Sequence, residues 1–153
     1  IIALVGMFFA FFLVVLGFTS PSPTGLIALI RTPDKTVHGI IRVSRHPVLA
    51  GIGLWSLMHM LCNANLAAWL FFGSLLCLCA LGANNIDRKR MALMGDAYAS
   101  IKRRTSIIPF IAIIDGRTAF AGGELGIARV LLATSSFCVF AVLHELIFTG
   151  RVL

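Results

Sequence analysis

The chain has 153 residues, of which 59% are hydrophobic and only 12% are charged, and its mean hydropathy is +0.97. Water-soluble domains carry about a quarter charged residues, so this composition excludes an ordinary soluble domain and indicates a protein embedded in a lipid bilayer. The formal net charge of +7 favours basic loops that face anionic lipid headgroups. We expect no nucleic-acid partner, because no aromatic residues are interleaved with the basic ones.

Four apolar segments are predicted to span the bilayer, at residues 1–18, 47–61, 66–83 and 127–148. A span takes about 20 residues, so the segment at 47–61 is short unless its basic start lies among the headgroups. Two shorter apolar segments, 25–30 and 107–114, are predicted to be interfacial or re-entrant. The predicted fold is an all-α integral membrane helical bundle of about four transmembrane helices, in a single domain over residues 1–153.

Charge predicts the orientation of the bundle. Basic residues are concentrated at 31–46 and 84–106, whereas the connection at 62–65 carries no charge. The positive-inside rule places both basic segments on the cytoplasm-like side. We expect the inner membrane of a bacterium or an organelle membrane, in a plastid or a mitochondrion. Because the chain begins inside an apolar run and without Met, we also expect a truncated or processed amino end.

The cysteines are interpreted as small packing residues. All of them lie in or at the ends of apolar segments, and they form no CxxC pair: Cys62, Cys77, Cys79 and Cys138. A disulfide framework is not expected, and neither is a zinc site, because Cys and His are not grouped at ligand spacing.

The histidines are the candidate ligands, because an ionisable side chain inside a membrane segment is costly and marks function. His46 and His59 are separated by a helical rise of about 20 Å, so they cannot share one metal ion. His144 is expected at the depth of His59 if the last helix also begins on the basic side. Two histidines at one depth on different helices are typical of a bis-histidine metal or haem site.

Aromatic residues accompany both candidate ligands. Trp55 shares a helix face with His59, and Phe140 shares one with His144. Flat rings beside a histidine suit a porphyrin or a polyene. The competing interpretation is structural: phenylalanines at helical spacing usually face lipid or a core, and a histidine near a helix end often hydrogen-bonds a neighbouring carbonyl group.

Four stretches carry a resemblance to a known family. They are RVSRHPVLAGIGLWSLMHMLCNANLAAWLFFG at 42–73, DRKRMALMGDAYASIKRRTSIIPFIAIIDGR at 87–117, GGELGIARVLL at 122–132 and LHELIFTG at 143–150. In this order they resemble the NnrU family of membrane proteins, to which zeta-carotene isomerase of phototrophs is related. Members of that family usually have further amino-terminal helices, one of them with a histidine, and this chain is expected to lack them.

The resemblance implies a membrane helical bundle. In the isomerase branch it also implies haem b, whose iron assists the cis-to-trans isomerisation of a carotenoid-type polyene. The family's histidine falls on His59, which is therefore the expected axial ligand, and His144 is the geometrically available second ligand. Some isomerases have a cysteine three residues earlier, where this chain has Ser56, so an exchange of ligands there is not expected. Other NnrU members are linked to nitric oxide metabolism and denitrification, which leaves the enzyme class open between the branches.

A rival hypothesis starts from Arg45-His46-Pro47. This tripeptide and the later GDAYASIKRRT segment also resemble isoprenylcysteine carboxyl methyltransferases and membrane sterol reductases. In that case a carboxylate or phosphate of the cofactor would be held by Arg45, His46, Arg103 and Arg104. The structural interpretation is favoured, with Pro47 as the first helical residue and Arg45 extending to lipid phosphates.

A third hypothesis is a non-catalytic subunit of a larger membrane complex. Small residues in the second segment, Ala50, Gly51 and Gly53, permit close helix contact, which drives association in lipid. The acidic residues near the basic segments are expected in interfacial ion pairs. These pairs join Asp87 to Arg88 or Arg90, and Asp115 to Arg117.

Overall fold

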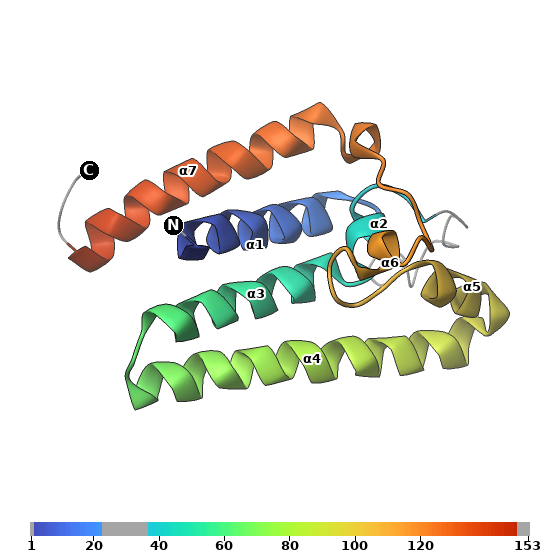
Figure 1. The fold of residues 1–153 in the computed structure, drawn as a ribbon, viewed down its shortest axis with the longest axis horizontal. Helices are drawn as coiled ribbons and strands as arrows, with labels where there is room; N and C mark the ends of the chain where they lie inside the picture. The colour runs from blue at the N-terminus through green and yellow to red at the C-terminus, as the bar shows by residue number, and fades with distance from the viewer. Residues whose placement is uncertain (1, 23–36, 150–153) are drawn as a thin grey trace.

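A computed structural model describes residues 2–22 and 37–149 of the chain (Figure 1). In chain order the helices are α1 (Ile2–Thr19), α2 (Ile40–Val43), α3 (Pro47–Cys62), α4 (Leu66–Met94), α5 (Asp96–Arg104), α6 (Ile111–Ile114), the 3₁₀ turn η2 (Gly122–Leu125) and α7 (Ile127–Thr149). The predicted all-α fold class is confirmed, and the described ranges contain no strand.

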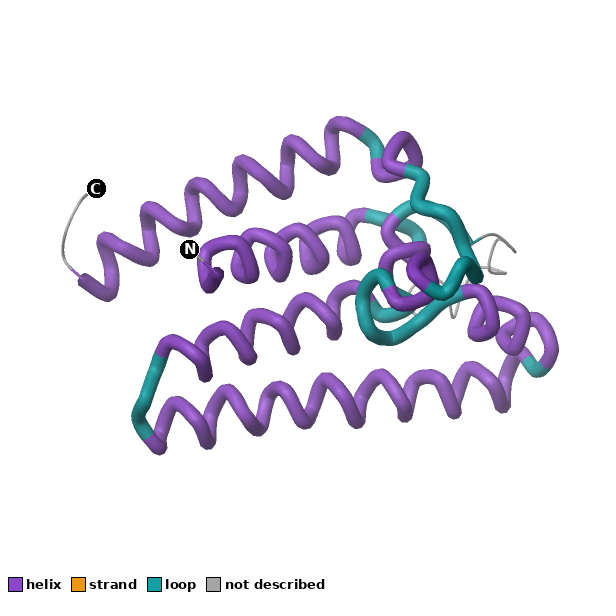
Figure 2. Tube along the Cα trace, in the orientation of Figure 1, coloured by secondary structure: helices purple, strands orange, loops and turns teal. Residues whose placement is uncertain are grey.

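The four long helices lie side by side in the order α7, α1, α3, α4 (Figure 1). Residues 63–65 close a hairpin between α3 and α4, and we call this side of the bundle the hairpin end. The short helices α2, α5 and α6 and most of the loops gather on the opposite side (Figure 2), which we call the basic end. The described residues of both basic segments lie there, as the charge pattern predicts.

Three helices, α1, α4 and α7, are long and apolar enough to cross a membrane. Two of the predicted spans coincide closely with α1 and α7, whereas α4 continues past residue 83 as far as Met94. The fourth predicted span, at 47–61, coincides with α3, which is apolar but has only 16 residues. At 1.5 Å per residue it is about 24 Å long, less than the roughly 30 Å hydrocarbon core.

Local sequence explains where these helices begin and end. Pro47 occupies the first turn of α3, where its missing N–H needs no partner. The side chain of Asn65 caps α4 by accepting a hydrogen bond of 2.8 Å from the N–H of Ala68. Gly95 separates α4 from α5 with a φ of 53°, a left-handed conformation that glycine adopts without a steric penalty.

The buried apolar core lies at the basic end rather than midway along the bundle. Its members come from the second half of α1, from α2 and the residues just before it, and from α5, η2 and the first turns of α7: Leu13, Leu16, Val37, Ile40, Ile41, Val43, Tyr98, Ile101, Leu125 and Ala133. Along the rest of α4 and α7 many large apolar side chains, such as Leu70 and Val139, are exposed. Lipid is the solvent that this surface suits.

The short predicted segments have different outcomes. Residues 107–114 form a loop and the short helix α6 at the basic end, where the N–H of Phe110 donates a 2.9 Å hydrogen bond to the carbonyl oxygen of Val43. This agrees with a segment that does not span. The predicted segment at 25–30 lies outside the described residues.

The cysteines differ from the prediction in their packing. All of them are free; Cys79 is buried, but the others are exposed: Cys62, Cys77 and Cys138. Only Cys79 is therefore a packing residue within the protein.

Helices α1 and α3 make a close contact that depends on a glycine. A Cβ atom at Gly51 would lie 2.7 Å from the carbonyl oxygen of Ala10 and 2.7 Å from a methyl group of Val14. Gly53, two residues further along α3, has room for a methyl group, because the nearest atom to a Cβ there would be a methyl group of Leu76 at 3.5 Å. The small residues of α3 thus serve contacts inside the chain.

We expect Gly51→Ala to destabilise the protein by about 1–3 kcal/mol, because the added methyl group forces α1 and α3 apart. Gly53→Ala is the matched control, and it should be neutral or slightly stabilising because alanine favours the helix by up to about 1 kcal/mol. Thermal unfolding in detergent micelles measures both. Equal unfolding temperatures for the two variants would contradict this helix contact.

Candidate functional site

The structure brings His59 of α3 and His144 of α7 together near the hairpin end. Their ring centroids are 6.3 Å apart, and the ring planes are inclined by 62°. The predicted equal depth of the two histidines is confirmed, although α1 lies between their helices along most of the bundle (Figure 1). Two histidines far apart in the sequence therefore lie beside each other at the surface of the bundle, with His59 half-buried and His144 exposed.

His59 has a fixed ring orientation. Its ring stacks on Phe72 of α4, with centroids 4.5 Å apart and planes at 26°, and it also contacts Trp55 at 4.4 Å. Its Nδ1 lies 3.0 Å from the carbonyl oxygen of Trp55. A carbonyl oxygen only accepts, so Nδ1 carries the proton and donates it, and Nε2 keeps its lone pair. Histidines that bind metals usually have this arrangement.

Aromatic rings continue from the histidine pair along α1 and α7. Phe140 lies 6.4 Å from His144 and 5.3 Å from Phe11 between centroids. Phe137 extends the series by contacting Phe11 at 6.0 Å and Phe8 at 5.3 Å. We call this set the aromatic cluster; it consists of Phe8, Phe11, Trp55, His59, Phe72, Phe137, Phe140 and His144. It offers flat apolar surfaces around two nitrogen ligands.

The donor set of this site suits a metal that is bound by two histidines. Two imidazoles that each bind one ion at about 2 Å place their ring centres roughly 6 Å apart, close to the observed 6.3 Å. Within the described ranges, no group of three or more His, Cys, Asp or Glu side chains is placed to hold a metal ion.

Ser56 lies one turn before His59 and is fully buried. Its Oγ is the buried side-chain polar atom that has no hydrogen-bond partner in the described part of the chain. A buried hydroxyl group without a hydrogen-bond partner costs free energy of folding. Helix α3 therefore carries an unfavourable polar atom next to the candidate site.

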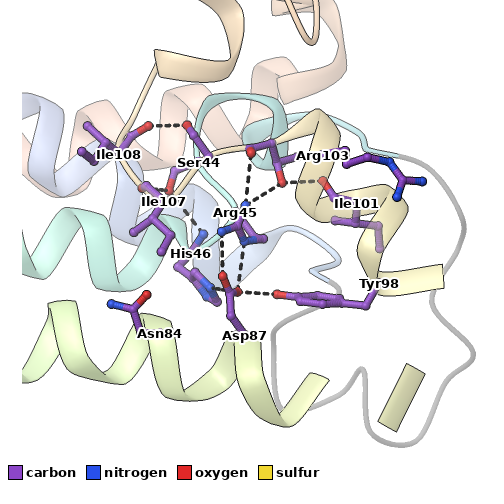
Figure 3. Close-up of polar contacts among 12 residues, drawn as sticks. Ser44, Arg45, His46, Asn84, Asp87, Tyr98, Ile101, Arg103, Ile107 and Ile108 are labelled. Atoms are coloured by element: carbon purple, nitrogen blue, oxygen red, sulfur yellow. Dashed lines mark hydrogen bonds and ion pairs between the residues drawn. The ribbon is translucent and has the colours of Figure 1, made fainter. Parts of the chain in front are cut away.

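A second group of polar residues is buried at the basic end around the carboxylate of Asp87 (Figure 3). Arg45 donates two hydrogen bonds to this carboxylate, from Nε to Oδ1 at 3.0 Å and from one terminal nitrogen to Oδ2 at 2.6 Å. The remaining terminal nitrogen of Arg45 donates to the carbonyl and hydroxyl oxygens of Thr105, both at 3.1 Å. Both charged side chains are at most 5% exposed, so this ion pair is shielded from water.

His46 and Tyr98 complete the shell of donors. Nε2 of His46 lies 2.7 Å from Oδ1 of Asp87, and the hydroxyl group of Tyr98 donates to the same oxygen at 2.6 Å. Burial, and then the hydrogen bond to the carboxylate, raise the pKa of Tyr98 well above its usual range. The phenol therefore remains a donor throughout the physiological range. We call Arg45, His46, Asp87, Tyr98 and Thr105 the Asp87 network.

The Asp87 network corrects three expectations. Arg45 is buried rather than extended to lipid phosphates, because Asp87 compensates its charge. Asp87 forms a salt bridge with Arg45, 42 positions away, a partner that the expectation of local pairs on α4 did not include. The third concerns the four proposed cofactor ligands: Arg103 and Arg104 are exposed, and Arg103 points away from Arg45 (Figure 3).

A second carboxylate links the start of α2 to η2. Glu124 binds Arg42 through two contacts of 2.7 and 2.9 Å and accepts a 2.7 Å hydrogen bond from the N–H of Gly39. Arg42, and then the Gly39 N–H, lower the pKa of Glu124 to about 2. The expected ion pair of Asp115 with Arg117 is also present, at 2.9 Å and partly exposed.

Sequence reasoning did not identify Phe72, Tyr98 or Glu124 as neighbours of the predicted site residues. A signal existed for Asp87, which is acidic at the point where an apolar helix becomes basic. The GDAY motif contains Tyr98, and GGELG contains Glu124, so both lie in the stretches that carried the family resemblance. Spacing along the chain could not show which arginine each acidic group would meet.

Comparison with known proteins gives consistent results. A family model described as "NnrU protein" matches residues 1–152. Two plant proteins, from Zea mays and Arabidopsis thaliana, are each 36% identical to this chain over 104 residues. Both are described as chloroplastic 15-cis-zeta-carotene isomerases. The match covers 65% of this chain but only 28% of each relative's length. No solved structure matches the chain.

We expect Asp87→Asn to destabilise the protein by about 3–5 kcal/mol, because it leaves the buried charge of Arg45 without a counter-charge. Asp115→Asn breaks a partly exposed pair and should cost at most about 1 kcal/mol. Thermal unfolding in detergent micelles compares the two substitutions. If both have the same small effect, the Asp87 network does not hold the basic end together.

The Glu124 pair predicts a dependence of stability on acid. The folded-state pKa of about 2 lies below the ordinary 4.5, so the pair contributes stability above about pH 4.5. That contribution is lost as the pH falls from there through about 2. Glu124→Gln removes it at all pH values, and the unfolding temperature of the variant should fall less than that of the wild type between pH 5 and pH 3. Parallel curves would contradict this role.

Proposed function

This chain belongs to the NnrU family, and from this premise we propose that it is a membrane-embedded isomerase that converts a cis double bond of an apolar, carotenoid-type polyene to trans. The names of the two plant relatives support this proposal, and their identity of 36% lies over most of this chain. Because the chain spans about 28% of the length of those relatives, the activity of the whole protein is part of the proposal.

The observation that carries the proposal is the histidine pair within the aromatic cluster. An apolar polyene dissolves in the bilayer and reaches this cluster from the lipid, since the apolar side chains of α4 and α7 are largely exposed. Aromatic faces bind a flat conjugated chain through dispersion and stacking. The site thus matches a substrate that has no polar group for the protein to recognise.

Haem b is the proposed cofactor, and His59 and His144 are the residues that would hold its iron. The fit rests on the separation of the two rings and on the Nε2 lone pair of His59, which the hydrogen bond of Nδ1 to Trp55 leaves available. When bound, haem iron would supply a metal centre that weakens the double-bond character of the substrate and so assists rotation about that bond.

The residues of the chain have defined roles in this proposal. The carbonyl group of Trp55 sets the tautomer of His59, and the stacked Phe72 sets its ring plane. The phenylalanines of α1 and α7 exclude water, which strengthens metal–ligand and electrostatic interactions in the site. The Asp87 network has a structural role at the opposite end, because its cationic groups are already bound to a carboxylate.

The proposed location is a bilayer, with the basic end on the cytoplasm-like side of a bacterial inner membrane or an organelle membrane. Three helices of spanning length support the membrane location. The plant relatives are described as chloroplastic, which makes a plastid-type membrane the first place to look.

The absorption spectrum of the protein purified from haem-replete cells tests the proposal. We expect a Soret band with haem and protein in equal amounts, and a loss of at least half of the bound haem in His59→Ala and in His144→Ala. His38→Ala is the matched control, because His38 is exposed at the basic end and should leave the spectrum unchanged.

Three results would contradict parts of this proposal. A colourless, iron-free protein would overturn the assignment of haem. Retention of full haem in His144→Ala would place the second ligand elsewhere. A protein that binds haem but leaves a 15-cis polyene unchanged when both are embedded in lipid would overturn the isomerase assignment and favour a non-catalytic subunit.

A further inference from the structure

The outer side of α4 carries a continuous groove near the basic end. Two hollows, with volumes of about 450 and 660 Å³, share Asn84 and Arg88 in their walls. We call the two together the α4 groove. Helix α4 lies at the edge of the row of helices (Figure 1), so this side is not covered by another helix of the described chain.

Polarity changes along the α4 groove in one direction. The part toward the middle of α4 is lined by Leu78, Leu81 and Gly82. The part toward the basic end is lined by Arg88 and by Lys102 of α5. The rise from Leu78 to Arg88 is about 15 Å. Gly82 is half-buried, and a Cβ atom there would be in ordinary van der Waals contact with a methyl group of Leu49 on α3, at 3.8 Å. The groove therefore has an apolar part, which we call the trough, and two cationic side chains at its end nearer the basic end of the bundle.

The part of the groove nearer the basic end has an excess of positive charge. Neither Arg88 nor Lys102 forms a salt bridge within the described part of the chain; Arg88 only approaches the amide oxygen of Asn85 at 3.5 Å. Asp87 also lines the groove, but Arg45 binds both of its oxygens. The one carboxylate in the wall is thus already neutralised, and two cations are left for a ligand.

We propose that the α4 groove is a binding site for one anionic phospholipid. The phosphate group lies between Arg88 and Lys102, and an acyl chain follows Leu78, Leu81 and Gly82 toward the middle of the bilayer. Charge complementarity selects an anionic headgroup, because a choline headgroup would bring its own cation against these two. The apolar trough distinguishes a lipid from a soluble phosphate compound.

This site is separate from the proposed catalytic one. It lies on α4 and α5 at the basic end, whereas the histidine pair lies on α3 and α7 near the hairpin end. A lipid held there would join α4 to α5 through Arg88 and Lys102, beside the contact between Tyr98 and Asp87. The lipid inference is therefore independent of haem and of isomerase activity.

Native mass spectrometry of the full chain in a neutral detergent tests this site, with phosphatidylglycerol and phosphatidylcholine as the added lipids. We expect one bound phosphatidylglycerol and no retained phosphatidylcholine. The double variant Arg88→Gln/Lys102→Gln should weaken phosphatidylglycerol binding by roughly 30-fold, because each cation near a headgroup contributes about a factor of five. The matched control is Lys89→Gln/Arg104→Gln, which removes two exposed cations from the same helices outside the groove and should change binding less than twofold.

A second variant tests the acyl part of the site. Leu81→Ala removes part of the apolar wall and should weaken phosphatidylglycerol binding several-fold, while the unfolding temperature stays about the same because Leu81 is 70% exposed and alanine favours the helix. Equal losses in the two double variants would show diffuse attraction and overturn the proposal. Equal retention of both lipids would also overturn it, and so would displacement of the lipid by glycerol 3-phosphate at similar concentrations.

Discussion

The buried carboxylate of Asp87 is the interaction on which the arrangement of the helices depends. It receives hydrogen bonds from Arg45 and His46 just before α3 and from Tyr98 of α5, and Arg45 continues to Thr105. One acidic group therefore connects α4 to three other parts of the chain. Since both charged partners are buried, removal of either leaves the other without compensation, which makes this point far more costly to break than a surface ion pair.

The Asp87 network also affects where residues lie at the hairpin end of the bundle. The network determines where α3 starts, and α3 is then held against α1 by the close contact at Gly51. Because a helix rises by a constant 1.5 Å per residue, these two constraints determine the depth of His59. His144 reaches the same depth on α7, which packs against the other side of α1. The candidate ligands thus lie side by side because of contacts made about 12 to 20 Å away from them along α3.

The helices and the depth of the two histidines could be predicted from the sequence, because both follow from apolar run lengths and from a constant helical rise. The partner of Arg45 could not be predicted: Asp87 is separated from it by a long hairpin, and nearer arginines on α4 competed for it. The apolar run at 66–83 predicts a span but not the end of α4, because the polar turns that follow continue the helix to Met94. Phe72 became a neighbour of His59 only through the packing of α3 on α4, a contact that periodicity along one helix does not contain.

The central claim is that the bundle places His59 and His144 side by side as a two-ligand site. Thiol cross-linking in native membranes tests it most directly, with His59→Cys/His144→Cys in a background in which Cys62, Cys77, Cys79 and Cys138 are replaced by alanine. A short bifunctional thiol reagent should join the two positions within one chain, whereas His38→Cys/His144→Cys should stay unlinked. Failure to link residues 59 and 144, with both thiols still reactive toward a monofunctional reagent, would contradict the site.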